Sequence, residues 1–236
     1  MNPTTLSCLL DLNRQFYQTF AMAFSATRQR LQPGVMRILG QVSQADSLLD
    51  LGCGNGELAR QLARQGSAGD YTGLDFSSTL LEQAAAGQPA NFHFLQADLS
   101  TTEWDAPLKG CHYNSILAFA VLHHLPGIDL RLQVLHKVRS LLPTGGYFIH
   151  SEWQFLNSPR LTARIQPWEA IGLSGNDVDP GDYLLDWLQG GKGLRYVHHF
   201  SETELEELAS LTGFEVVETF LSDGENHRLG LYQVWR

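Results

Sequence analysis

A short apolar segment that runs into three closely spaced glycines is the feature that most constrains this chain. Residues 48–51, Leu-Leu-Asp-Leu, lead directly into residues 52–56, Gly-Cys-Gly-Asn-Gly. Because glycine has no side chain, such a turn lets a ligand contact backbone N–H groups at the start of a helix. A carboxylate, Asp75, ends the next apolar run, where it can accept hydrogen bonds from both hydroxyls of a ribose. The pattern predicts a parallel sheet that binds a nucleoside-containing molecule at its carboxyl edge.

The spacing of these glycines separates two kinds of nucleotide-binding turn. Dinucleotide sites favour G-x-G-x-x-G, whereas Gly52, Gly54 and Gly56 follow G-x-G-x-G. A nicotinamide-dependent oxidoreductase is the main competing interpretation, and it would require the first spacing. The sequence also offers no convincing Tyr-x-x-x-Lys pair for hydride transfer, so this alternative is disfavoured.

Strand and helix patterns alternate through most of the chain. Strands are expected at residues 47–51, 71–75, 92–97, 113–119, 147–152, 214–220 and 229–235. Helices are expected at residues 57–65, 78–86, 130–142 and 202–211. This order predicts an α/β fold, a Rossmann-like seven-stranded and mostly parallel sheet with helices on both faces.

Two segments fall outside this alternation. Residues 5–40 carry apolar side chains at helical spacing, with Pro33 opening a second helix, so residues 1–44 are predicted to form an N-terminal helical lid. Residues 153–199 contain prolines, many glycines and several aromatic residues. We expect them to form an insertion with short helices after the fifth strand of one α/β domain that spans residues 45–236.

The glycine turn, the two acids at strand ends and the closing hairpin resemble the class I S-adenosylmethionine-dependent methyltransferases over residues 45–236. The resemblance implies methyl transfer, with S-adenosylmethionine as cofactor and S-adenosylhomocysteine as product. It implies Asp50 for the methionine ammonium and Asp75 for the ribose. The other implied cofactor contacts are Gly52, Gly54 and Gly56 through their backbone, Phe76, Asp98 and Leu99 at the adenine, and Phe119 at the methionine end.

A narrower resemblance concerns the methyl acceptor. Residues 24–28, Phe-Ser-Ala-Thr-Arg, and residues 195–198, Arg-Tyr-Val-His, are similar to motifs of the tRNA wobble-uridine methyltransferases that esterify a 5-carboxymethyl group, although Val197 replaces a Tyr of that family. The resemblance implies that Arg28 and Arg195 hold the acceptor carboxylate, a residue type suited to this task. It implies that Tyr196 and His198 stack on or hydrogen-bond the base.

The charge of the chain disfavours a tRNA acceptor. The net charge is −9, and acidic residues gather within residues 177–186 near the expected mouth of the site, where they would repel a phosphate backbone. A tRNA and a small-molecule acceptor methylated on oxygen or nitrogen therefore both remain open. A non-catalytic cofactor-binding subunit that serves a partner protein is a third hypothesis, and the intact set of cofactor residues disfavours it. His123 and His124 are expected to have a structural role at the rim.

The cysteine content and the lack of long apolar stretches bear on where in the cell the protein is expected. Three cysteines at wide spacing predict neither a disulfide framework nor a metal site. The chain shows no basic and apolar leader and no apolar stretch of membrane-spanning length. We therefore expect a cytoplasmic protein that does not bind membranes.

Overall fold

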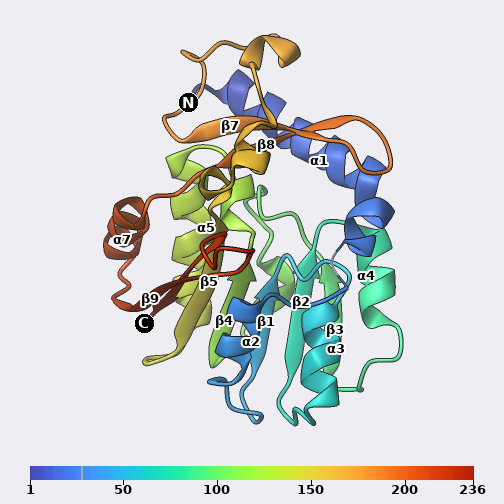
Figure 1. Ribbon diagram of the computed structural model, residues 1–236. Helices are drawn as coiled ribbons and strands as arrows, with labels where there is room; N and C mark the ends of the chain where they lie inside the picture. Colours follow the sequence, from blue (N-terminus) through green and yellow to red (C-terminus); the bar gives the residue numbers. More distant parts are fainter. Residues whose placement is uncertain (28) are drawn as a thin grey trace.

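The computed structural model describes residues 1–27 and 29–236, and a seven-stranded sheet forms its centre (Figure 1). The strands are β1 (Leu48–Leu51), β2 (Tyr71–Asp75), β3 (Phe92–Gln96), β4 (Ser115–Phe119), β5 (Tyr147–Trp153), β9 (Val216–Ser222) and β10 (Gly230–Trp235). They lie in the order β3-β2-β1-β4-β5-β10-β9, and β10 runs in the direction opposite to the other six of these strands. The predicted fold is confirmed, and the strand bounds agree within two residues.

Helices cover both faces of this sheet. α2 (Pro33–Leu39) and α3 (Glu57–Arg64) pack their apolar side chains on one face, and α5 (Ile128–Leu141) and α7 (Glu202–Leu211) pack on the other. α4 (Ser78–Ala85) contacts β2 and β3. Ser77 and Ser201 cap α4 and α7 by accepting hydrogen bonds from the N–H groups of Leu80 and Glu204. β1 and β2 are buried at every position, as expected for parallel strands covered on both faces.

The insertion after β5 differs from its prediction. It contains the expected short helices, η3 (Phe155–Asn157), α6 (Pro159–Thr162) and η4 (Trp168–Ile171). It also contains a second sheet, three-stranded and antiparallel, formed by β6 (Ile165–Gln166), β7 (Asp182–Trp187) and β8 (Gly193–His198). The prediction of short helices was therefore incomplete, because the many glycines and prolines of the segment obscured two strands of six residues each.

α1 (Pro3–Ala26) lies along the second sheet (Figure 1). Phe16, Tyr17 and Phe20 of α1 pack with Trp187 of β7 in one apolar cluster. Asn13 completes the contact, because its side chain accepts a hydrogen bond from the Tyr196 N–H at 2.8 Å and donates to the Tyr196 carbonyl at 3.1 Å. These bonds occupy backbone groups on the free edge of β8, which would otherwise be buried without partners. The helix is thereby fixed to the insertion.

Candidate functional site

The glycine turn after β1 presents bare backbone to a cavity of about 630 Å³. Gly52 and Gly54 both line the cavity and have left-handed backbone angles, φ of 70° and 55°. A Cβ on Gly54 would meet nothing within less than 4.0 Å, so it would occupy open space in the cavity. Glycine at position 54 therefore leaves room for a ligand against the backbone, whereas a Cβ on Gly52 would lie 2.7 Å from the Val121 side chain.

Gly56 has a different role from the one predicted. It begins α3 with a φ of 79°, and a Cβ there would lie 2.7 Å from Ala84 of α4. It is absent from the cavity wall as far as the described residues define it. The third glycine thus permits the close packing of two helices instead of ligand contact, a use of glycine that its spacing does not reveal.

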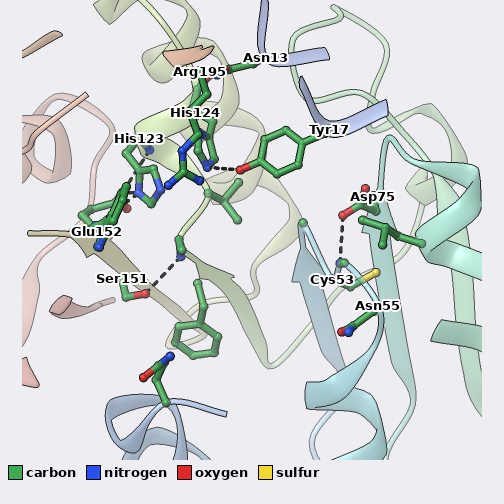
Figure 2. A pocket seen from close by; sticks show the side chains of 18 of the residues that line it. Asn13, Tyr17, Cys53, Asn55, Asp75, His123, His124, Ser151, Glu152 and Arg195 are labelled. Atoms are coloured by element: carbon green, nitrogen blue, oxygen red, sulfur yellow. Dashed lines mark hydrogen bonds and ion pairs between the residues drawn. The ribbon is translucent and has the colours of Figure 1, made fainter. Parts of the chain in front are cut away.

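Asp75 holds the glycine turn in place from the neighbouring strand (Figure 2). Its Oδ2 accepts the Gly54 N–H and its Oδ1 accepts the Ser77 N–H, each at 2.9 Å. Burial raises the pKa of Asp75, although these backbone hydrogen bonds oppose the increase. The carboxylate lines the cavity together with Phe76, so the turn and the acid predicted from separate strand ends do meet.

Asp50 lies deeper, at the end of β1. The Tyr71 hydroxyl donates to its Oδ2 at 2.6 Å. Burial, with a smaller contribution from the charge of Asp75, raises the pKa of Asp50 to about 7, and the Tyr71 hydrogen bond opposes that increase. Asp50 therefore changes its charge near neutrality, and a cation placed beside it would favour the charged form.

The remaining predicted cofactor residues, Asp98, Leu99 and Phe119, also line this cavity. Asp98 is paired with Arg14 of α1, whose Nη2 donates at 3.1 Å. Burial would raise the pKa of Asp98, but hydrogen bonds from Ser100 and Arg14 outweigh burial and lower it. We call the set Asp50, Gly52, Gly54, Asp75, Phe76, Asp98, Leu99 and Phe119 the cofactor half.

The other part of the cavity lies between α1, β5 and the insertion. Arg195 of β8 projects into it (Figure 2) with its guanidinium 4.8 Å from the Trp153 ring centre, 5.5 Å from that of Phe16 and 5.6 Å from that of Trp187. Such contacts of a guanidinium with aromatic rings are favourable and fix its plane. We call the set Tyr17, His123, Glu152, Trp153, Trp187 and Arg195 the acceptor half.

Tyr196 and His198 do not join Arg195 in the cavity, in contrast to the prediction. Both are buried on the other face of the β7–β8 hairpin. The Tyr196 hydroxyl donates to Asp182 at 2.7 Å, and the two ring nitrogens of His198 lie 2.7 Å from Asp182 and 2.9 Å from Glu204. Arg131 of α5 donates to the Tyr196 hydroxyl at 3.1 Å. These side chains attach the hairpin to α5 and α7. Arg28, the other predicted acceptor residue, lies outside the described residues.

Sequence reasoning missed three site residues. Tyr17 of α1 places its hydroxyl 2.7 Å from His124 Nε2, and Arg14 covers Asp98; neither position carries a signal in the sequence. Glu152 lies next to the last residue of β5, and one of its oxygens bonds to His123 and the other to His150. The rule that located Asp50 and Asp75, an acid at the carboxyl end of a parallel strand, would have found Glu152 as well.

Comparison with known proteins decides between the nucleoside cofactors that such a cavity suits. A family model described as "Methyltransferase domain" matches residues 24–219. The chain belongs to this methyltransferase family. Its fold and its relatives make S-adenosylmethionine the cofactor and S-adenosylhomocysteine the product. The residues of this methyltransferase fit that molecule, because the bare turn at Gly54 and the Asp75 carboxylate face the same cavity.

Several proteins illustrate the range of the similarity. A candidate methyltransferase of Encephalitozoon cuniculi is 29% identical over 208 residues, 86% of this chain and 87% of that protein. The 2-phytyl-1,4-naphtoquinone methyltransferase of Nostoc sp. is 39% identical over 97 residues, but these cover only 39% of this chain and 42% of the relative. The tRNA (carboxymethyluridine(34)-5-O)-methyltransferase ALKBH8 of Mus musculus is 26% identical over 59% of this chain and 19% of its own length.

Among solved structures, the 1,6-didemethyltoxoflavin-N1-methyltransferase of Burkholderia thailandensis superposes with a TM-score of 0.67 over 100% of this chain and 90% of its own, at 18% identity. At this identity the likeness establishes the fold. Within the described part of this methyltransferase, no cluster of three or more His, Cys, Asp or Glu residues is placed to bind a metal ion. No helix formed by the described residues combines the length and apolar character that crossing a bilayer requires.

Proposed function

We propose that this chain transfers the methyl group of S-adenosylmethionine to a small molecule bound in the acceptor half. The placement of Arg195 supports this proposal most strongly: a guanidinium is held inside the cavity by three aromatic rings. Such a slot suits a flat molecule that carries, or develops during the reaction, negative charge. α1 and the insertion close over it, as the cluster of Phe16, Phe20 and Trp187 indicates.

In this proposal each residue of the cofactor half has one task. Asp50 binds the methionine ammonium, and Asp75 accepts hydrogen bonds from the ribose hydroxyls. Asp98 accepts from the adenine amino group, with Phe76 and Leu99 beside the ring, and Phe119 lines the methionine end. Gly52 and Gly54 offer their backbone, whereas Gly56 permits the close approach of α3 to α4.

Bound S-adenosylmethionine supplies an already activated methyl group, so the chain contributes mainly alignment of the two reactants. Its own residues provide this alignment. Asp75 fixes the Gly54 turn, and Asn13 fixes α1 against β8. These bonds hold the residues of the cofactor half and of the acceptor half in fixed positions. We propose that residues 1–44 act as the lid that closes the acceptor half.

A tRNA acceptor is the second candidate, favoured by the similarity to ALKBH8 and by Arg195, a suitable partner for the carboxylate of a 5-carboxymethyl group. Two observations speak against it. Tyr196 and His198, which would contact the base, are buried away from the cavity. The chain also carries a net charge of −9, which disfavours binding to a phosphate backbone.

The test is to incubate the protein with S-adenosyl-[methyl-d3]methionine and, separately, with total tRNA and with the metabolites of the source organism that pass a 3-kDa filter. We expect a deuteriomethylated product in the small-molecule fraction by mass spectrometry. Arg195→Met should abolish most of that product and retain S-adenosylhomocysteine binding. A labelled nucleoside ester from tRNA alone would replace the proposal with the second candidate, and no product from either fraction would refute catalysis.

A further inference from the structure

A buried imidazole–carboxylate pair lies in the wall of the acceptor half and takes no part in the cofactor contacts. Glu152, near the end of β5, is 1% exposed. Its Oε2 accepts the backbone N–H of His123 at 3.1 Å and lies 3.0 Å from Nδ1 of the same residue. The Trp153 backbone N–H also lies 3.4 Å from the same Nδ1. Because a neutral Nδ1 cannot donate and accept at once, we assign its proton to the shorter contact with Glu152. Together these contacts fix the position and the orientation of the His123 ring.

The fixed ring is placed to act on a bound molecule. His123 belongs to η2 (Leu122–His124), the turn that follows β4 at the carboxyl edge of the sheet, and it lines the cavity. Since Nδ1 faces Glu152, the opposite nitrogen, Nε2, lies on the far side of the ring from the carboxylate. Figure 2 shows that the His123 ring and the Arg195 guanidinium point toward one another. Nε2 and the guanidinium therefore face the same part of the acceptor half.

The surroundings act on the protonation of the pair in opposite directions, and a base at His123 requires Glu152 in its ionised form. Burial raises the pKa of Glu152 well above its usual value, although the His123 N–H and the charge of Arg131 oppose the increase. His150, whose Nδ1 lies 3.1 Å from Glu152 Oε1, stays neutral because burial lowers its pKa to about 3. Within the described part of the chain, further charged or titratable groups near the pair include His124 of η2, Glu204 of α7 and, beyond His124, Tyr17 of α1. Arg195 of β8 also faces the ring, and its positive charge opposes protonation of the imidazole.

We propose that His123, oriented by Glu152, is the general base that removes a proton from a hydroxyl or ring N–H of the acceptor during methyl transfer. This inference rests on the proposed function and narrows its substrate class. In the step, the acceptor oxygen or nitrogen bonds to the methyl carbon while the carbon–sulfur bond breaks and its electron pair stays on sulfur. The acceptor proton moves to His123 Nε2, and the Glu152 carboxylate balances the resulting charge.

The pair favours one kind of acceptor over another. A carboxylate is ionised at neutral pH and needs no base, whereas a phenolic or enolic hydroxyl or a ring N–H must lose a proton to become a good nucleophile. Arg195 beside the ring would stabilise negative charge that develops on such an acceptor. The acceptor class is therefore a flat molecule with a weakly acidic O–H or N–H group, not the ester-forming carboxylate expected from the narrower sequence resemblance.

A purely structural role is the competing explanation, since Glu152 also anchors η2 through the His123 backbone N–H. The first test separates the two without any acceptor. Protein labelled with [¹⁵N]histidine and saturated with S-adenosylhomocysteine is titrated by long-range ¹H–¹⁵N correlation spectra, with the His123→Asn variant assigning the signal. In Glu152→Gln we expect the midpoint of the His123 titration to fall by about one pH unit or more, because the imidazolium loses its carboxylate partner. The surface variant His136→Asn should leave that midpoint unchanged. An unshifted midpoint in Glu152→Gln, or a His123 that stays protonated up to pH 9, would overturn the proposal.

The second test measures transfer. With the deuteriomethyl product of the metabolite fraction as the readout, we expect His123→Asn to lower the transfer rate about 10²- to 10⁴-fold while S-adenosylhomocysteine affinity stays within twofold. Glu152→Gln should slow transfer and move the acidic limb of the pH–rate profile to lower pH, and His136→Asn should match the parent. A His123→Asn variant with full rate and intact cofactor affinity would refute the base. If the parent protein makes no labelled product, the proposed function fails, and the titration still decides whether the pair exchanges a proton as described.

Discussion

Replacement of Asp75 by Asn tests the cofactor half most directly. The side chain is 8% exposed, and its oxygens accept hydrogen bonds from the N–H groups of Gly54 and Ser77, both at 2.9 Å. Asn has almost the same shape, but it is uncharged and presents an NH₂ group in place of one oxygen. One backbone N–H would then face a donor, and one ribose hydroxyl would lose its acceptor.

The size of the effect follows from these bonds. A hydrogen bond to a charged group contributes about 1.5–3 kcal/mol, and two ribose hydroxyls share this carboxylate in our proposal. Asn retains one neutral acceptor, so the loss should be about 2–4 kcal/mol, which corresponds to about 30- to 700-fold weaker binding of S-adenosylhomocysteine.

Isothermal titration calorimetry with S-adenosylhomocysteine measures this change. The matched control is Asp70→Asn, which removes an exposed carboxylate just before the opposite end of the same strand, β2, and should leave affinity unchanged. Circular dichroism and thermal melting identify any general loss of structure. An Asp75→Asn protein that is folded and binds within threefold of the parent would refute the assignment of this carboxylate to the cofactor.

Three further predictions concern the pH response, the insertion and α1. The pKa of Asp50 is about 7 and its charged form binds the ammonium, so cofactor affinity should rise with pH up to about 7 and then level off. Calorimetry should find this dependence abolished in Asp50→Asn. Because the folded-state pKa lies above the unfolded value, Asp50 also lowers the stability of the fold as pH rises from about 4 to 7. Arg131→Met removes the guanidinium beside the buried carboxylate of Asp182 and the partly exposed one of Glu204. Loss of a cation from a buried carboxylate should cost about 3–5 kcal/mol and lower the melting temperature by about 6–20 °C in calorimetric scans; a decrease below 2 °C would contradict the account. Tyr17→Phe removes the bond to His124 and should speed S-adenosylhomocysteine release about 2- to 10-fold, so an unchanged stopped-flow rate would show that α1 does not control the site.

The central sheet was predictable because its strands are short apolar runs separated by helical patterns. Strands buried on both faces must be apolar throughout, and β1 and β4 meet that condition almost completely. The cofactor half followed from the same order, since parallel strands bring their carboxyl ends to one edge. Asp50, Asp75 and Asp98 lie at or just after the ends of three neighbouring strands, and all three line one cavity.

The acceptor half was harder to predict because it is built from segments that do not belong to the sheet. Tyr17 comes from α1 and Trp187 from β7, and their meeting depends on how α1 packs on the insertion. Periodicity identifies a helix and its apolar face, but it does not identify the surface against which that face packs. The contact of Asn13 with the edge of β8 is of the same kind, since it depends on a strand that the composition of the insertion concealed.

The division within residues 195–198 follows from strand geometry. Successive side chains of a strand point to opposite faces, so a strand that directs Arg195 into the cavity must direct Tyr196 and His198 away from it. Only a helix or an irregular loop could present all three to one ligand. The residues on the far face instead bond Asp182 of β7 and Glu204 of α7, and these bonds attach the hairpin to the body of the domain. Tyr196 and His198 therefore affect the acceptor half indirectly, because they hold in place the strand that carries Arg195.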